Sequence, residues 1–274
     1  MVERSAPSRS VRADAVIAAG DRSEAARTAA LRLAFLAALL LLWWAAARAA
    51  PAGLFASPAA VAAAGLRMAA EGRLWPALGQ SLAIYLTGTV AAIVAGIALG
   101  ALMGTVRPIG RMLDVYVNAL AATPRVAFIP LIIVLLGLGY EAKVAIVFLG
   151  AVMPIVINTY AGVLNADGEL VEMARASGAT RPQIFRRILL PGALPFIVVG
   201  LRLGATIGLI NTVVAELYTA VRGLGGLLAI YGNTFQMAPY FVVVFVLAAI
   251  GTLVTTGLRL IEVRTERWRY DGNG

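Results

Sequence analysis

Glu172–Pro191, with the sequence EMARASGATRPQIFRRILLP, is a polar segment between two long hydrophobic runs. It carries five ionisable side chains in a chain of 274 residues, of which 14% are charged and 61% hydrophobic. A soluble domain normally contains about a quarter charged residues. The apolar residues form blocks of about 20, the length that a helix needs to cross about 30 Å of hydrocarbon. The sequence therefore predicts an all-α integral membrane protein with one prominent polar loop.

Six segments are long and apolar enough to span a membrane. They are Leu33–Ala50, Ser81–Gly104, Val115–Gly139, Ala142–Leu164, Leu194–Ala215 and Tyr240–Ile261. Lys and Arg accumulate in the cytoplasmic loops of membrane proteins. With the N-terminus inside, the cytoplasmic segments hold 16 of the 23 basic residues and the outside segments hold five. Both termini and the loop 165–190 are therefore predicted to be cytoplasmic.

The spans divide the chain into a domain and two tails. Residues 1–32 are rich in Arg, Ala and Ser without apolar periodicity, which predicts a disordered cytoplasmic tail. A secretory signal peptide is the competing interpretation, because ARAAPA at 47–52 resembles a cleavage site, but the polar lead is too long for a usual n-region. Residues 33–264 form the predicted six-span domain, and residues 265–274 form a cytoplasmic C-terminal tail.

Composition excludes several kinds of chemistry. The chain has no Cys and no His, so it has no disulfides, thiolate nucleophiles or imidazole bases. Its one lysine, Lys143, does not follow a glycine, so the chain has no phosphate-binding loop of the ATPase type. The net charge of +9 comes from dispersed arginines that suit membrane topology, and we expect no nucleic-acid partner. No internal repeat is visible, which favours pairing with a second chain.

The first half of the polar loop has the pattern of a short capped helix. Asp167 is placed to cap it, and Glu169 lies in the first turn, where the helix dipole favours negative charge. A small apolar face follows at helical spacing: Leu170, Met173, Ala174 and Ser177. Gly178 is the expected residue just after the helix, because the chain must turn there through a positive φ.

A second short helix is predicted directly after this turn. Thr180 and Gln183 have the spacing of a capping box, and Pro182 suits the first turn. Pro191 and Pro195 should then break the chain before the fifth span. Two interpretations of the loop remain from these residues alone. It is either a solvated loop carrying positive-inside arginines or a small knob that docks into a partner.

Five residues of this loop resemble a family signature. Glu172, Ala174, Gly178, Ile188 and Pro191 match the pattern of permeases in binding-protein-dependent ABC importers, with Met173 as a mild departure. The resemblance extends over residues 50–262. The run TPRVAFIPLIIVLLGLG at 123–139 is similar to the nitrate/sulfonate/taurine branch, and the resemblance assigns no role to Arg125 within it.

The resemblance implies a fold, partners and a location. The fold would be a type I-like ABC importer transmembrane domain, in which the polar loop is a coupling helix that docks into a separate ATPase. A second copy of the chain, two ATPase subunits and an external substrate-binding protein would complete the transporter in a bacterial inner membrane. The chain would not be an enzyme and would bind no cofactor, because the partner ATPase uses the ATP and Mg. The solute would be a small anion such as nitrate, a sulfonate or taurine, although relatives also carry thiamine-related pyrimidines.

Four further residues are candidates for the translocation path or its gate. Arg202 lies within the fifth span, where an ionisable group is costly and usually faces a bundle interior or water. Its role is either structural or in the pathway. Glu216 ends the same span, and Gly223 and Gly225 permit a re-entrant turn, so Glu216 either lines an external gate or is solvated at a helix end.

Two other functions are compatible with a six-span chain. An autonomous channel or ion-coupled carrier would need its own coupling-ion site, and carboxylates are scarce in these spans. A membrane scaffold without a transport role would leave the partner ATPase equally active when the spans are deleted.

Overall fold

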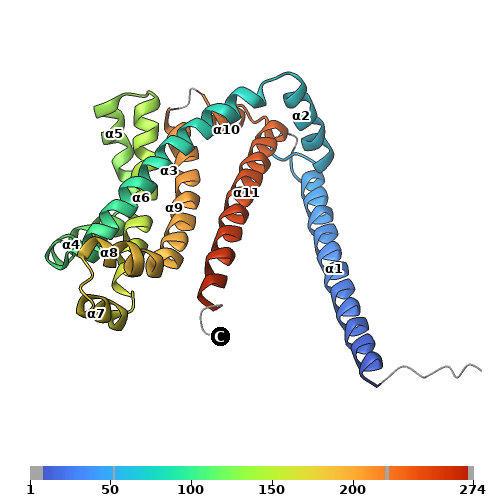
Figure 1. Cartoon of the computed structure of the whole chain (residues 1–274). Coiled ribbons are helices and arrows are strands. Elements are labelled where there is room, and N and C mark those ends of the chain that lie inside the picture. The colour runs from blue at the N-terminus through green and yellow to red at the C-terminus, as the bar shows by residue number, and fades with distance from the viewer. Residues whose placement is uncertain (1–8, 52, 220–221, 271–274) are drawn as a thin grey trace, which may run out of the picture. The chain divides into compact units, whose positions relative to one another are not determined.

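The computed structural model describes the backbone of residues 9–51, 53–219 and 222–270. Residues 1–8 of the predicted N-terminal tail and 271–274 of the predicted C-terminal tail lie outside this part. The chain forms two compact units, residues 1–63 and 64–274, which are considered separately. All regular structure in the described residues is helical, as the sequence predicts (Figure 1).

The first unit consists mainly of α1 (Arg9–Ala49). Residues 26–49 are apolar enough to cross a membrane and correspond to the first predicted span. The helix nevertheless begins at Arg9, where the sequence predicts a disordered tail up to residue 32. Alanine, arginine and glutamate are strong helix formers, so this stretch continues the helix. At the other end, the Trp43 indole N–H donates a hydrogen bond to the Ala56 carbonyl at 2.9 Å.

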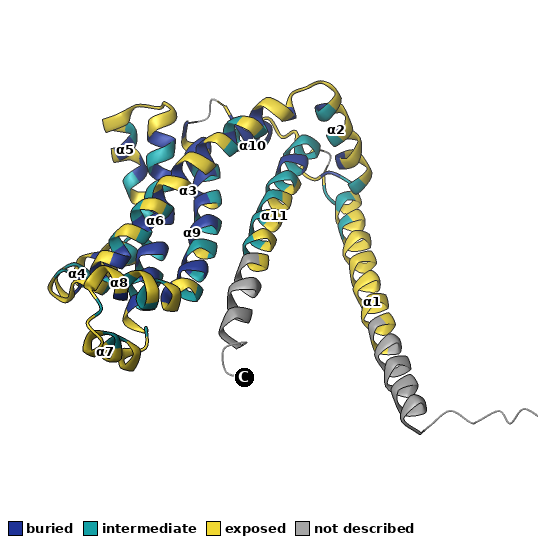
Figure 2. Cartoon of the chain, in the orientation of Figure 1, coloured by how far each residue is buried: buried dark blue, intermediate teal, exposed yellow. Residues whose placement is uncertain are grey.

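Three helices form the centre of the second unit: α3 (Leu74–Thr105), α6 (Tyr140–Leu164) and α9 (Leu190–Thr219). Both α3 and α9 pack along α6, and their contacting faces are buried (Figure 2). Glycines permit this close approach, since a Cβ on Gly96 would lie 2.8 Å from Ile155 and one on Gly200 would lie 2.8 Å from Asn158. Small residues are how helices pack closely in lipid, where apolar burial adds little.

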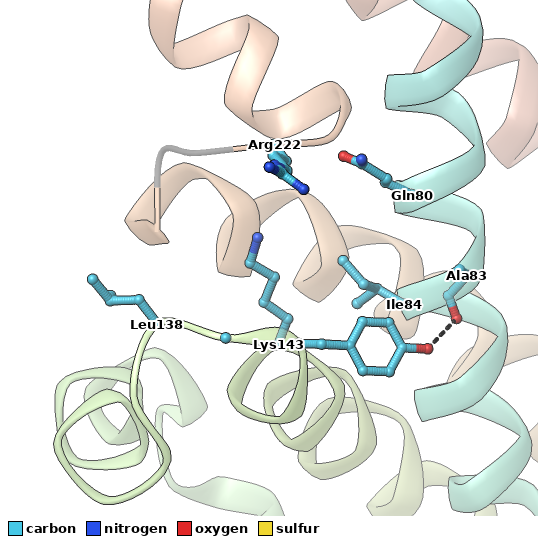
Figure 3. Close-up of a pocket in the computed structure, with 8 residues that line it drawn as sticks. Gln80, Ala83, Ile84, Leu138, Lys143 and Arg222 are labelled. Carbon is cyan, nitrogen blue, oxygen red and sulfur yellow. Dashed lines mark hydrogen bonds between the residues drawn. The ribbon is translucent and has the colours of Figure 1, made fainter.

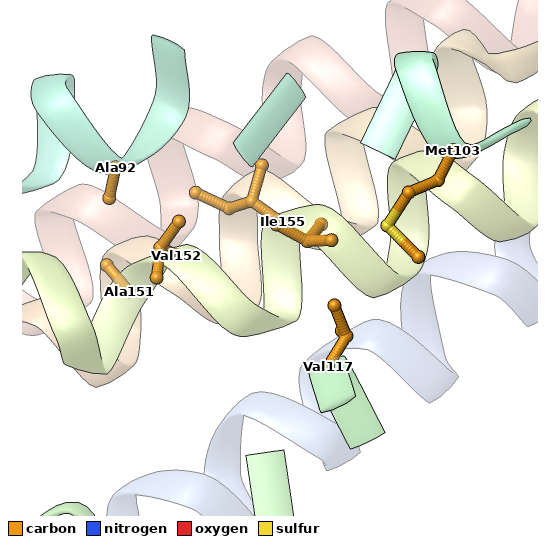
Figure 4. Close-up of a cluster of buried hydrophobic side chains, with 7 residues drawn as sticks. Ala92, Met103, Val117, Ala151, Val152 and Ile155 are labelled. Atoms are coloured by element: carbon orange, nitrogen blue, oxygen red, sulfur yellow. The ribbon is translucent and has the colours of Figure 1, made fainter. Parts of the chain in front are cut away.

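A hydrophobic cluster fills the space between α3, α4 (Arg107–Ala122) and α6 (Figure 4). Its buried members are Ala92, Met103, Val117, Ala151, Val152, Ile155 and Val156. The cluster fixes α6 in the middle of the unit. Because the middle of α6 is packed on all these helices, the candidate functional residues lie near its two ends.

The third predicted span, Val115–Gly139, is not one straight helix. It comprises the end of α4, a short 3-10 turn (Arg125–Phe128) and α5 (Ile129–Leu136), with a bend of 88° between the two parts. Pro124 causes the break, because proline lacks an N–H and forces the preceding residue out of the helical region. Thr123 accordingly has an extended conformation, with φ −74° and ψ 133°. Five helices of the described chain can span a membrane, or six if this bent pair counts as one.

The predicted break before the fifth span is wrong. After α7 (Gly168–Ala176) and α8 (Arg181–Ile184), the chain continues through a π-helical turn (Phe185–Leu189) directly into α9. Residues 181–219 therefore form one helical stretch. The wider π turn moves the carbonyl that the Pro191 ring would otherwise meet, and proline has no N–H to leave unbonded. Beyond α9, α10 (Leu224–Asn233) and α11 (Met237–Tyr270) complete the fold and pack on α9.

Candidate functional site

The segment 167–189, named here the α7–α8 knob, lies at the end of α6 (Figure 1). Its first helix is capped as the sequence predicts. The Asp167 carboxylate accepts hydrogen bonds from the backbone N–H groups of Glu169 at 2.9 Å and Leu170 at 3.3 Å. These bonds satisfy amides that have no partner within the helix. The short helix therefore has a defined beginning although it lies outside the packed centre.

The turn between the two helices depends on Gly178. Its φ is +78°, in the left-handed region that L side chains rarely adopt. The N–H of Ala179 donates to the Ala174 carbonyl at 2.9 Å, which closes the end of α7. The Gln183 side chain then accepts hydrogen bonds from the Thr180 N–H at 2.8 Å and the Thr180 hydroxyl at 3.0 Å. The predicted glycine turn and capping box are both present.

The knob presents an apolar face to its surroundings. Leu170 is 44% exposed and Met173 is 60% exposed. Glu172 is exposed beside them and Ala174 is half-buried. The two other predicted coupling residues lie at the base of the knob, where Ile188 is half-buried in the π turn and Pro191 is exposed at the start of α9. Buried Ile184 anchors this base to the bundle.

A buried carboxylate lies at the opposite end of the same helices. Glu216, near the end of α9, is 0% exposed. The Ser81 hydroxyl on α3 lies 2.7 and 2.9 Å from its two oxygens, and the Gly225 N–H donates to it at 2.8 Å. The Ser81 oxygen in turn accepts the Leu224 N–H at 2.8 Å. Glu216 therefore joins α3 and α9 to the first turn of α10, where the helix dipole favours an anion.

Both predicted gate glycines surround this carboxylate. Gly223 has φ +94° and begins the turn into α10. A Cβ on Gly225 would lie 2.6 Å from the Cβ of Glu216, so no larger residue fits there without movement. Arg202 lies on α9 nearer the knob and is half-buried. The structure thus brings together Glu216, Gly223 and Gly225 and separates Arg202 from them.

Sequence reasoning missed the partners of Glu216 and a pocket beside it. The pocket has a volume of about 380 Å³ and includes Lys143, Arg222 and Gln80 in its lining (Figure 3). Ser81 is separated from Glu216 by 135 positions. The one available signal was the polar pair Gln80–Ser81 at the start of an apolar span. The position of this pair in the sequence does not predict a contact with α9.

The described residues thus form a membrane-spanning bundle with an exposed knob at one end and a buried carboxylate at the other. The family model described as "Binding-protein-dependent transport system inner membrane component" matches residues 88–267. The chain belongs to this family. It is the membrane-spanning permease of an ATP-driven importer, as the sequence predicts.

Individual relatives agree with this assignment. The chain is 31% identical over 198 residues to the taurine transport system permease protein TauC of Escherichia coli, covering 72% of each chain. It is 38% identical over 159 residues to the putative aliphatic sulfonates transport permease protein SsuC of the same organism, covering 58% of this chain and 60% of the relative. It is 34% identical over 218 residues to the riboflavin transport system permease protein RibX of Chloroflexus aurantiacus, covering 80% and 81%.

Solved structures share the fold. The MetNI methionine ABC transporter in an inward-facing conformation has a TM-score of 0.60 at 24% identity, over 68% of this chain and 93% of that chain. An amino acid ABC transporter crystallised with histidines also has a TM-score of 0.60, at 20% identity, over 73% and 97%.

Proposed function

We propose that this permease works as a homodimer that carries a small organic anion across the bacterial inner membrane. Two separate ATPase subunits would bind the α7–α8 knobs from the cytoplasm and supply the energy from ATP and Mg. An external binding protein would deliver the solute. The chain itself would bind no cofactor and would do no covalent chemistry, and both of its termini would be cytoplasmic.

The proposed coupling role is supported by the structure of the α7–α8 knob. It is a rigid unit, because both helix beginnings are capped and the turn is fixed by Gly178. It is also unpartnered on one side, since Leu170 and Met173 expose large apolar surfaces beside charged groups. A continuous helix joins it to the centre of the bundle through residues 181–219. A force applied to the knob would therefore move α9 directly.

The anionic solute is supported by the relatives and by the charge of the chain. TauC and SsuC are named for taurine and aliphatic sulfonates. Arg125 adds a cation at the break between α4 and α5, where it donates to the Ala121 and Gly150 carbonyls at 3.3 Å. RibX is named for riboflavin, so the fold also serves other cargo. Sulfonates are the class that the names of TauC and SsuC favour.

An autonomous channel or ion-coupled carrier fits these observations less well. Such a carrier needs an intramembrane site for its coupling ion. Among the residues that the structure describes, no cluster of three or more acidic groups could hold a cation. Glu216 is the one buried carboxylate in that part, and its oxygens already accept hydrogen bonds.

Uptake into vesicles tests the proposed function. The permease, its ATPase and its binding protein are reconstituted, and labelled taurine and ethanesulfonate are offered with and without ATP. We expect accumulation of at least one sulfonate only with ATP, and none when the phosphate-binding lysine of the ATPase is replaced. Equal uptake without ATP would favour the channel or carrier instead.

The same preparation tests the assembly. Permease chains with two different affinity tags are expressed together, and each tag should recover the other chain along with the ATPase. A transporter that is active with one permease chain per complex would contradict the homodimer.

Single cysteines test the orientation, because the natural chain has none. Thr180→Cys lies in the knob, and Arg73→Cys lies at the opposite end of the bundle on a side chain that is 65% exposed. In intact cells, a membrane-impermeant maleimide should label Arg73→Cys and spare Thr180→Cys until the membrane is opened. Labelling of Thr180→Cys from outside would reverse the proposed topology.

A further inference from the structure

The pocket beside Glu216 lies at the end of α6 that is opposite the α7–α8 knob (Figure 3). Its walls come from the beginning of α3, from the α5–α6 connection with the first turn of α6, and from Arg222 just before α10. The lining residues are Gln80, Ala83, Ile84, Leu138, Gly139, Tyr140, Lys143 and Arg222. In the proposed orientation, this is the external end of the bundle.

Lys143 is buried in this pocket with its ammonium group directed inward. The side chain is 6% exposed, and Figure 3 shows its nitrogen pointing towards Arg222. Within the described ranges of the chain it makes no hydrogen bond and no ion pair. It interacts electrostatically with Glu216, but Ser81 and Gly225 already donate to that carboxylate. The Lys143 nitrogen is not one of the buried side-chain atoms that lack a hydrogen-bond partner, so it opens into the pocket, where its three donors can meet a ligand.

The pocket holds a second cation beside polar groups of mixed kind. Arg222 is exposed at the rim and contributes a guanidinium, and Gln80 contributes a half-buried amide. Gly139 precedes α6 without a side-chain cap, so the first amides of that helix face an uncapped end. The Tyr140 hydroxyl is held by Thr87 at 2.7 Å and Ala83 at 3.2 Å, which fixes this wall. The two cations and the free amides at the start of α6 suit an anion.

The charges in the lining favour a small anion. Lys143 and Arg222 are the two charged lining residues, and both are cations. Glu141 is exposed and does not belong to the lining, but one of its carboxylate oxygens lies 2.9 Å from the position that a Cβ on Gly139 would take. Ile84 and Leu138 supply apolar wall, which suits a short alkyl group beside the charged one.

We infer that this pocket binds the anionic group of the transported solute, a small sulfonate or similar oxyanion, before it crosses the membrane. The inference rests on the proposed function for the direction of transport. Occupancy of the pocket can nevertheless be measured without transport, because it concerns a binding site on this chain alone.

Lys143 is the single lysine of the sequence, which makes the test specific. The full-length permease in phosphatidylcholine nanodiscs is treated with a neutral acetylating ester, and acetylation of the Lys143 peptide is followed by mass spectrometry. Ethanesulfonate, which has no amine, is the probe, and chloride keeps the ionic strength constant. A site with a dissociation constant of about 1 mM would be about nine-tenths occupied at about 10 mM, so acetylation should slow about tenfold.

Two variants separate a site from general charge effects. Arg222→Gln removes the second cation and should abolish the protection by ethanesulfonate. Arg73→Gln removes an exposed cation at the same end of α3 and should retain the protection. An acetylation rate that ethanesulfonate leaves unchanged, or protection that survives in Arg222→Gln, would overturn the inference.

A lipid headgroup could supply the same chemistry as the solute. The labelling is therefore repeated in phosphatidylglycerol nanodiscs without ethanesulfonate. Equal protection there, together with no further effect of ethanesulfonate, would assign the pocket to lipid and overturn its role for the solute. Because labelling needs no ATPase, intact protection without ATP-dependent uptake would count against the proposed function and not against the pocket.

Thermal unfolding gives a second readout that does not depend on the reactivity of the buried amine. Ethanesulfonate should raise the unfolding midpoint of the unmodified chain, because a ligand that binds the folded state stabilises it. It should not raise the midpoint of Lys143→Gln. Equal shifts in both proteins would contradict binding at Lys143.

Discussion

Replacing Gly178 with valine is expected to abolish ATP-driven transport while leaving the membrane-spanning helices folded. The φ of +78° is unfavourable for any β-branched residue, although a Cβ would meet nothing within 4 Å. The effect is therefore backbone strain of about 1–3 kcal/mol at the turn, without a steric clash. The turn would relax by moving α7 relative to α8. This would displace the Leu170 and Met173 face from its proposed partner.

The measurement is solute-stimulated ATP hydrolysis and uptake by the complex in vesicles, with the amount of permease checked in parallel. Gly72→Val is the matched control, because Gly72 has φ +72° and also has no atom within 4 Å of its Cβ position. It should bear similar strain at the opposite end of the bundle and retain coupling. Gly178→Asn should lose less activity than valine, since asparagine tolerates this conformation better.

Normal transport by Gly178→Val would show that the α7–α8 knob is not the coupling element. Glu172→Ala offers a graded comparison at the same site. It removes an exposed charge and no packing, so we expect a partial loss of stimulated hydrolysis and no change in the amount of folded protein.

Glu216→Ala is expected to cause the largest loss of stability. It would leave the Gly225 N–H and the Ser81 hydroxyl without their buried acceptor and would open a cavity beneath Gly223. Each neutral donor that is left buried without an acceptor costs about 1–3 kcal/mol. The Gln side chain in Glu216→Gln has a similar shape and keeps one acceptor oxygen. This variant should therefore destabilise the protein less.

The midpoint of thermal unfolding in detergent, together with the yield of monodisperse protein, measures this effect. Glu141→Ala is the control, because Glu141 is an exposed carboxylate at the same end of the bundle. Ser81→Ala should give an intermediate loss, since Gly225 still donates to the carboxylate. Full stability of Glu216→Ala would mean that this cluster does not hold α10 against α9.

Features that depend only on neighbouring residues could be predicted from the sequence. The Asp167 cap, the Gly178 turn and the Thr180–Gln183 cap are each made within a few positions of the chain. The apolar blocks likewise determined the all-α membrane class, because every backbone polar group in lipid must be bonded within its own helix. Local rules of this kind are visible in the printed order of residues.

Local rules do not predict whether a helix continues through a proline. Pro124 and Pro191 both precede apolar runs, yet the first ends a helix and the second is accommodated by a π turn. A proline interrupts a helix only when neighbouring turns cannot adjust to its ring and its missing N–H. Which outcome occurs is decided by the packing of the flanking segments on α6.

Tertiary structure alone decided the chemistry at the other end of the bundle. Glu216 looks in sequence like the end of an apolar span, and Lys143 looks like a loop cation. The fold buries both, joins Glu216 to Ser81 across 135 positions and brings Lys143 towards Arg222. Contacts between such distant residues depend on how glycine-lined helices pack together. No local pattern records that packing, so these partners emerge only from the assembled bundle.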